Sequence, residues 1–148
     1  MAEYDPLWPD AAMPALAHDS AHLHVAGLAR YVDDEPELPG TLHLAFGLSS
    51  EARARIVSVD LAAVRAFPGV VAAYTAADIP GENNVGPIAH DDRVLANGEV
   101  VSHGQPVFLV AAETRAAARK AARLGKVTYE QLEPAITVEA ARSAGSRT

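Results

Sequence analysis

Hydrophobic residues recur with the twofold period of β-strands in several short segments of the chain. Residues 41–48 alternate strictly and place four large apolar side chains on one face: Leu42, Leu44, Phe46 and Leu48. This alternation predicts a half-buried strand. Four further segments have a strand-forming composition: 54–59, 70–75, 106–112 and 126–130. Residues 70–75 are apolar on both faces, so we expect that strand to be a central one in its sheet.

Helical segments separate these predicted strands. The clearest one has its N-cap at Thr114, continues over residues 114–124 and ends at Gly125, and its alanines form a slim apolar stripe that suits close packing on a sheet. Asp60 is expected to cap a second, shorter helix over residues 61–67. The pattern therefore combines strands with one main helix and shorter helical pieces.

The order of these segments is typical of an α+β (mixed α/β) domain. We predict one domain containing a mixed sheet of about four to five strands, the main helix 114–124 and short helices. Residues 75–78 match the spacing of a capping box, with Asp78 in place of glutamate. Residues 136–141 predict a last short element.

Three stretches lack a periodic pattern. Residues 1–17 contain three prolines and are expected to form a flexible leader. Residues 81–98 are rich in glycine, proline and asparagine and predict a long loop, of a length that is usually functional or mobile. Residues 144–148 lose apolar character and are interpreted as a tail or a truncation point. The folded domain is therefore expected over residues 18–143.

Composition excludes several classes of protein. The chain has 148 residues, a net charge of −7 and no cysteine, which removes disulfides, thiolate metal sites, cysteine-ligated iron–sulfur clusters and a cysteine nucleophile. The acidic balance disfavours nucleic-acid binding. No apolar run approaches the length of a membrane span, and the acidic, proline-interrupted N-terminus does not match a secretory signal. The predicted location is therefore the cytoplasm, with no membrane partner.

Charge is distributed unevenly. Residues 1–50 carry eight acidic side chains against the single base Arg30, whereas the remainder is balanced. The acidic segment, residues 1–50, is interpreted either as a solvated tail and turn or as an arm that docks on a basic partner. On the main helix, Arg115, Arg119 and Arg123 follow a spacing of four residues. This basic row either binds an anionic partner or forms a solvated helix face.

Catalytic motifs are absent from the sequence. His18, His22 and His24 cluster near Asp19, but no single regular conformation aligns all three imidazoles, so a metal site there is only the lesser alternative. The chain contains no dinucleotide-binding glycine motif, Walker loop, His-Glu-x-x-His or Gly-x-Ser-x-Gly pattern. We therefore assign no catalytic, cofactor-binding or metal-binding residue.

The tripeptide Gly104, Gln105 and Pro106 opens one of the predicted strands. Glycine allows a close backbone approach, and the glutamine amide offers both a hydrogen-bond donor and an acceptor. A plain turn at the entry to a strand explains the same residues.

Five segments together resemble a known family: HVAGLARYVDD (24–34), PGTLHLAFGLSSEARARIVSVDL (39–61), FPGVVAAYTAADIPGENNVGP (67–87), VLANGEV (94–100) and HGQPVFLVAAETRAAARKAARLGKVTYEQLEPAITVEAA (103–141). Their order is similar to the α/β hammerhead domain that begins the molybdenum-binding part of xanthine dehydrogenases and aldehyde oxidases. The Leu-Ala-Phe-Gly-Leu-Ser run resembles the large subunit of bacterial xanthine dehydrogenase more than the aldehyde-oxidising branch.

The resemblance implies a scaffold without catalytic residues of its own. In that family, the catalytic glutamate and the molybdopterin-contacting loops belong to segments that this sequence does not contain. The positions that match the family are Gly104, Gln105 and Pro106, and the resemblance implies a structural role for them. Molybdenum–molybdopterin, 2Fe-2S and FAD are expected in the complete enzyme, and none is expected to be bound by this chain alone.

Two functions remain open. In the first, the chain is a structural or assembly domain of a molybdenum hydroxylase that hydroxylates purines and passes electrons through iron–sulfur clusters and FAD to NAD. Its partners are then the molybdopterin-binding domains and the iron–sulfur/FAD subunit, and the isolated 148-residue chain is inactive. In the alternative, the chain is a stand-alone protein-binding module derived from the hammerhead domain.

Overall fold

The computed structural model describes residues 18–88 and 92–145. The predicted leader at 1–17 and most of the tail at 144–148 lie outside these residues. The elements follow in this order: α1 (Ala21–Val25), η1 (Val32–Asp34), β1 (His43–Leu48), β2 (Ala54–Asp60), α2 (Ala62–Arg65), β3 (Val70–Thr75), η2 (Ala76–Asp78), β4 (Glu99–Val100), β5 (Pro106–Ala112), α3 (Arg115–Ala122), β6 (Lys126–Gln131) and α4 (Val138–Ser143). The α+β class is thereby confirmed.

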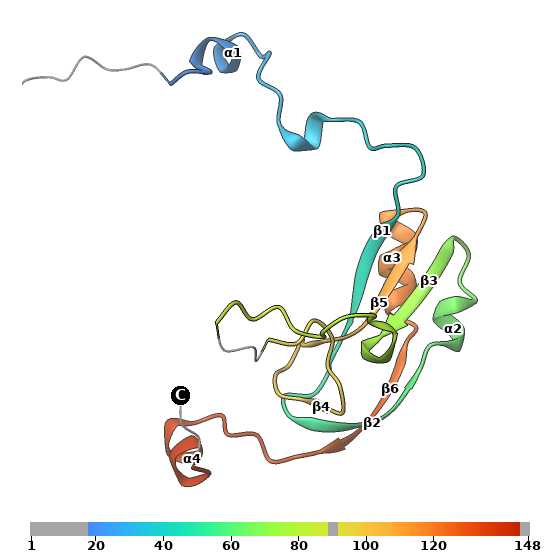
Figure 1. Ribbon diagram of the computed structural model, residues 1–148, viewed down its shortest axis with the longest axis vertical. Coiled ribbons are helices and arrows are strands. Elements are labelled where there is room, and N and C mark those ends of the chain that lie inside the picture. The colour runs from blue at the N-terminus through green and yellow to red at the C-terminus, as the bar shows by residue number, and fades with distance from the viewer. Residues whose placement is uncertain (1–17, 89–91, 146–148) are drawn as a thin grey trace, which may run out of the picture. The chain divides into compact units, whose positions relative to one another are not determined.

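In the described ranges, six strands form two antiparallel sheets of three, rather than one mixed sheet. Sheet 1 has the order β1-β5-β3, and sheet 2 has the order β4-β2-β6. In sheet 1, β5 lies in the centre, with β1 and β3 on either side and α3 against the sheet (Figure 1). The prediction that residues 70–75 form a central strand is therefore wrong, because β3 is an edge strand of sheet 1.

The core lies between the two sheets and the helices α2 and α3. α3 packs on β1 and β5, while α2 packs on β3 and α3. The largest fully buried side chains are all apolar: Phe108, Val64, Val100, Val107 and Val110. Ala118 and Ala121 are fully buried on α3, so the alanine stripe predicted from the sequence is the side of α3 that meets the sheet. Small side chains allow this close approach.

The helix starts follow the predicted capping chemistry. The Thr114 hydroxyl accepts a hydrogen bond from the Ala117 amide at 3.1 Å, as an N-cap residue does. The Asp60 carboxylate accepts from the Ala62 amide at 2.9 Å at the start of α2. Asp78 reaches back to the Thr75 amide at 2.7 Å and closes a reciprocal capping box.

The end of α3 differs from the prediction. The helix ends at Ala122, and Gly125 does not have the positive φ of a left-handed helix stop. A Cβ at Gly125 would instead overlap the ring of Phe108. A Cβ at Gly47, the register partner of Phe108 across β1 and β5, would overlap the same ring. Both glycines are therefore required by the aromatic side chain that lies against them.

The chain divides into two compact units, one ending at Leu38 and one beginning at Pro39. The described residues of the first unit contain no buried side chain. Within this unit, the Tyr31 hydroxyl lies 3.0 Å from Nδ1 of His24, and Arg30 forms an exposed 2.9 Å ion pair with Glu35. No helix in the described part of either unit is long and apolar enough to cross a membrane.

Candidate functional site

The loop that contains Gly104, Gln105 and Pro106 is tied to the end of β1 by backbone hydrogen bonds. The Gly104 amide donates to the Ser49 carbonyl at 2.9 Å, and the Ser49 amide donates to the Gln105 carbonyl at 2.9 Å. Gly104 has a φ of +81°, which glycine adopts without the strain of a side chain. Ser49 is a buried polar residue, with 2% exposure. These two hydrogen bonds thus tie the loop before β5 to the end of β1.

The side chain of Gln105 also bonds within the loop. Its Oε1 accepts a hydrogen bond from the Val101 amide at 2.8 Å. The Pro106 carbonyl accepts from the Ala96 amide at 2.7 Å. The tripeptide therefore holds together the ends of three segments, which suits the structural role that the resemblance implies.

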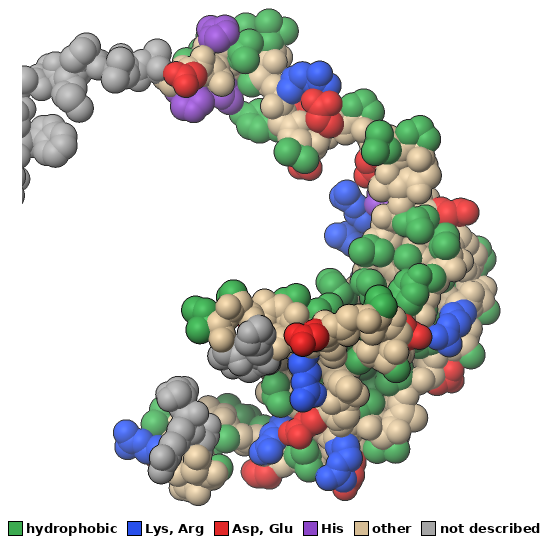
Figure 2. Space-filling model, in the orientation of Figure 1, with side chains coloured by type: hydrophobic (Ala, Val, Ile, Leu, Met, Phe, Trp, Pro, Cys, Tyr) green, Lys and Arg blue, Asp and Glu red, His purple; other side chains and the backbone are tan. Residues whose placement is uncertain are grey.

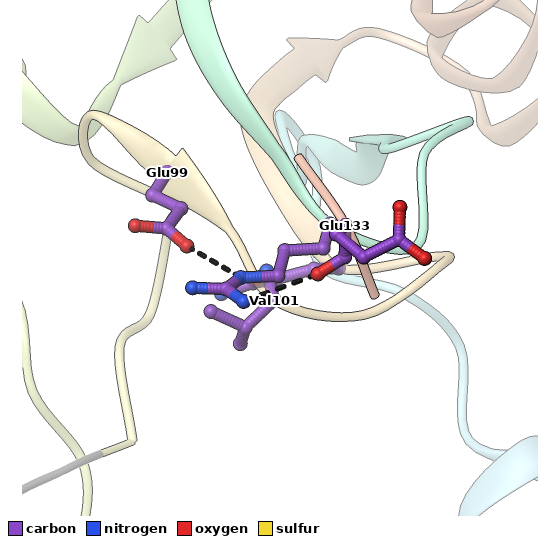
Figure 3. Close-up of polar contacts among 5 residues, drawn as sticks. Glu99, Val101 and Glu133 are labelled. Carbon is purple, nitrogen blue, oxygen red and sulfur yellow. Dashed lines mark hydrogen bonds and ion pairs between the residues drawn. The ribbon is translucent and has the colours of Figure 1, made fainter. Parts of the chain in front are cut away.

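A second set of hydrogen bonds converges on Arg53, the residue before β2. Its Nε donates to Oε1 of Glu99 at 3.2 Å, and its Nη1 donates to the Glu133 carbonyl at 3.1 Å. Glu99 and Glu133 approach this guanidinium from opposite sides (Figure 3). In addition, the Leu132 amide donates to the Arg53 carbonyl at 3.1 Å. These contacts of Arg53 hold the segment after β6 against the start of β2. The Arg53–Glu99 ion pair is half exposed and contributes only modestly to stability.

One face of sheet 1 is apolar and exposed. Phe46, Leu109 and Tyr74 are register partners across β1, β5 and β3, so their side chains lie in one row on one face. Leu44 belongs to the next row, whose β5 and β3 members are alanines. Phe46 is 49% exposed and Leu44 is 62% exposed. We call Leu44, Phe46, Leu109 and Tyr74 the apolar sheet face.

The predicted alternation of β1 is therefore present, but the expected burial is wrong. The side of β1 that packs inside carries Ala45 and Gly47, because α3 and the Phe108 ring occupy the space next to them. The large side chains point the other way. Hydrophobic side chains are exposed over the region of β1 and β3 (Figure 2).

A groove of about 490 Å³ lies on the other side of β1, next to Phe108. Its apolar lining includes Phe108 and Val127, and Arg119 of α3 and the C-cap residue Arg123 lie along it. Arg115, Arg119 and Arg123 are exposed, and none of the ion pairs among residues 18–88 and 92–145 involves them. The basic row stays open to either interpretation, solvated face or anion-binding surface.

The histidine cluster does not form a metal site among the described residues. The His18 and His24 rings meet edge to face at 6.0 Å, and His24 bonds to Tyr31 instead of converging with His22 and Asp19. Within the described ranges, no group of three His, Asp or Glu side chains could hold a metal ion.

Among the residues that the structure describes, one titratable group, Asp78, has a clearly shifted pKa. The backbone amide of Thr75 and then its hydroxyl donate hydrogen bonds to the Asp78 carboxylate, and these bonds lower the pKa of Asp78 below its ordinary value. Asp78 is solvent exposed and belongs to a capping box. The shift therefore has a structural cause and does not mark a catalytic acid.

Comparison with known proteins gives a consistent result. The a/b hammerhead domain of aldehyde oxidase and xanthine dehydrogenase matches residues 26–133. Xanthine dehydrogenase of Oryza sativa subsp. japonica is 42% identical over 131 residues, which are 88% of this chain and 10% of that protein. Aldehyde oxidase 4 of Cavia porcellus is 46% identical over 126 residues, 84% of this chain and 9% of that protein.

Solved structures contain the same fold. The reconstituted CO dehydrogenase from Oligotropha carboxidovorans superposes with a TM-score of 0.70 at 38% identity, over 77% of this chain and 14% of that one. The chain belongs to the aldehyde oxidase and xanthine dehydrogenase family, in which it corresponds to the hammerhead domain. It spans only about a tenth of the length of the curated relatives it matches.

Sequence reasoning missed two features of this region. The overlap of Gly47 and Gly125 with one aromatic ring has no local signal, because it joins residues far apart in the sequence. The pairing of Asn83 with Leu95 was also missed. The Asn83 side chain donates to the Leu95 carbonyl at 2.7 Å and accepts from its amide at 2.9 Å, which closes the base of the loop 81–98. The asparagine in a glycine-rich loop was the one available hint.

Proposed function

We propose that this chain is a structural, non-catalytic domain of a molybdenum hydroxylase of xanthine dehydrogenase type. The observation that carries the proposal is the match to the family's hammerhead domain over residues 26–133, combined with coverage of only about a tenth of the relatives' length. The catalytic and cofactor-binding residues then belong to the other nine-tenths of such an enzyme.

The complete enzyme hydroxylates a purine and passes the electrons through iron–sulfur clusters and FAD to NAD, in the cytoplasm. Molybdenum–molybdopterin, 2Fe-2S and FAD supply this redox chemistry when bound in the other domains or subunits. The contribution of this chain is to present a folded surface on which those parts assemble. The loop of Gly104, Gln105 and Pro106 maintains that surface by holding β1, β4 and β5 together.

The test is the metal content of the native complex. We expect the affinity-tagged chain, purified from its own cells, to carry a larger subunit with near-stoichiometric molybdenum. Deletion of residues 18–143 from the enzyme should abolish both the complex and its cofactor content, and re-expression of the intact chain should restore them. Normal molybdenum content in the deletion strain's enzyme would contradict the proposal.

The alternative function, a stand-alone protein-binding module, predicts a different outcome. Such a module is monodisperse by itself and purifies with no molybdenum. The exposed large side chains of sheet 1 favour the enzyme domain, because a soluble monomer seldom leaves a contiguous apolar sheet face in water. Turnover of xanthine by the isolated chain would contradict both functions.

A further inference from the structure

The three strands of sheet 1 contain no formally charged carboxylate, ammonium or guanidinium group. Their sequences are HLAFGL in β1, VVAAYT in β3 and PVFLVAA in β5. One side of this sheet packs on α3 and α2 and contributes Phe108 and Val110 to the core. The other side is the apolar sheet face of Leu44, Phe46, Leu109 and Tyr74. A sheet with one solvated side normally alternates apolar residues with polar ones, and sheet 1 does not.

Sheet 2 of the same domain shows what a solvated sheet looks like in this protein. Arg55 and Glu130 are register partners, and their side chains form a 2.6 Å ion pair with about 60% and 57% exposure. Asp60 and Lys126, which carry opposite charges, are register partners at the other end of the strands. The exposed side of sheet 2 thus carries both acidic and basic side chains. The contrast indicates that the apolar sheet face of sheet 1 is not a surface that water covers in the functional protein.

On the apolar sheet face, Leu44 is 62%, Phe46 49% and Tyr74 44% exposed. A charge-free patch with a tyrosine is the composition of the buried centre of a protein interface, where aromatic residues are enriched and charged ones depleted. The tyrosine hydroxyl keeps one polar group available at the edge of such a patch.

We infer that the apolar sheet face docks onto the remainder of the molybdenum hydroxylase. This inference rests on the proposed function. The occupant is the larger polypeptide that makes up about nine-tenths of the curated relatives, and it presents an uncharged apolar surface to β1, β5 and β3. In the solved CO dehydrogenase, the matching fold is likewise only 14% of a longer chain. Most of the protein able to cover this face therefore lies outside the 148 residues.

Cysteine labelling tests the inference directly, because the chain contains no cysteine. Leu44→Cys places one thiol on the apolar sheet face, and Tyr74→Cys places a second reporter on the opposite edge strand. Val57→Cys is the matched control, since Val57 is an aliphatic strand residue of sheet 2 with 61% exposure against 62% for Leu44. Each variant is treated with a maleimide, once as isolated chain and once in the natively purified complex, and labelling of this chain is followed by mass spectrometry.

In the isolated chain, we expect all three thiols to react at similar rates. In the molybdenum-containing complex, labelling at positions 44 and 74 should slow more than about tenfold because the thiols are inaccessible, while position 57 should keep its rate. Equal rates at positions 44 and 57 in that complex would overturn the inference and leave the proposed function standing. Protection of position 44 in the isolated chain would identify a second copy as the occupant and overturn it as well. A native preparation without molybdenum or a larger subunit would overturn the proposed function together with this occupant.

Discussion

Substituting Gly47 with alanine tests the close approach between β1 and the ring of Phe108. The new methyl group would overlap the ring, which is only 2% exposed. The ring has little room to retreat, because Gly125 lies equally close to it. Either the Phe108 side chain must therefore change its conformation, or β1 must move away from β5.

The magnitude follows from two opposing effects. Alanine in a strand interior is ordinarily favoured over glycine by about 0.5–1 kcal/mol, since glycine loses more backbone entropy on folding. Overpacking a well-packed core costs about 1–3 kcal/mol. Because the overlap is with a buried ring held on both sides, we take the upper end of that range, about 3 kcal/mol. Subtracting a gain of up to about 1 kcal/mol for replacing glycine, we expect Gly47→Ala to lower the free energy of unfolding by about 2 kcal/mol.

Urea denaturation followed by far-UV circular dichroism measures this change. With a slope of about 1–3 kcal/mol/M for a small domain, the midpoint should fall by about 1 M. Gly81→Ala is the control, because no atom lies within 4 Å of a Cβ at Gly81 and its φ is not positive. The control should be unchanged or more stable by up to about 1 kcal/mol.

A double-mutant cycle assigns the loss to the ring itself. In a Phe108→Leu background the ring is absent, so Gly47→Ala should cost at least about 1 kcal/mol less than in the parent chain. Two results would refute the reasoning: a Gly47→Ala protein as stable as the parent, or an equal loss in both backgrounds.

Three further predictions concern single side chains. Asn83→Ala removes both hydrogen bonds to the buried Leu95 backbone, and should lower the free energy of unfolding by about 1–3 kcal/mol in urea titrations, whereas an unchanged midpoint would contradict the pairing. Thr114→Ala should cost about 1 kcal/mol and Thr114→Ser much less, because serine retains the capping oxygen. The folded-state pKa of Asp78 is lowered, so its bonds to Thr75 stabilise the fold above the unfolded-state pKa of about 3.9, and that stability is lost as pH falls through the folded value. Thermal melts should therefore show Asp78→Asn less stable than the parent at pH 7 and equal to it at the acid end, and a constant difference at all pH values would argue against this linkage.

Most strands and the main helix could be predicted from the sequence, because their periodicity is local. The segments that became β1, β2, β3, β5 and β6 were each found within a few residues. The same holds for α3, whose N-cap at Thr114 is a local hydrogen bond. β4, with two residues, and α1, with five, were missed because such short elements carry no measurable period and depend on their partners.

The position of a strand within its sheet is a different kind of property. Residues 70–75 are apolar on both faces, yet β3 is an edge strand. The apolar character reflects what lies above and below the strand, whereas an edge is defined by hydrogen bonding to neighbours. β5 has the same composition and is central. Composition alone could not distinguish the two strands.

The sequence by itself determined which side chains of β1 share a face, because a strand has a strict twofold period and the alternation of leucines is unambiguous. It also determined the family, through the order of segments that matches the hammerhead domain. Only the tertiary structure decided that Gly47, rather than the leucines, faces the core, because α3 and the Phe108 ring fill that side. A period states which residues point the same way, and the contacts of distant segments decide whether that way is inward.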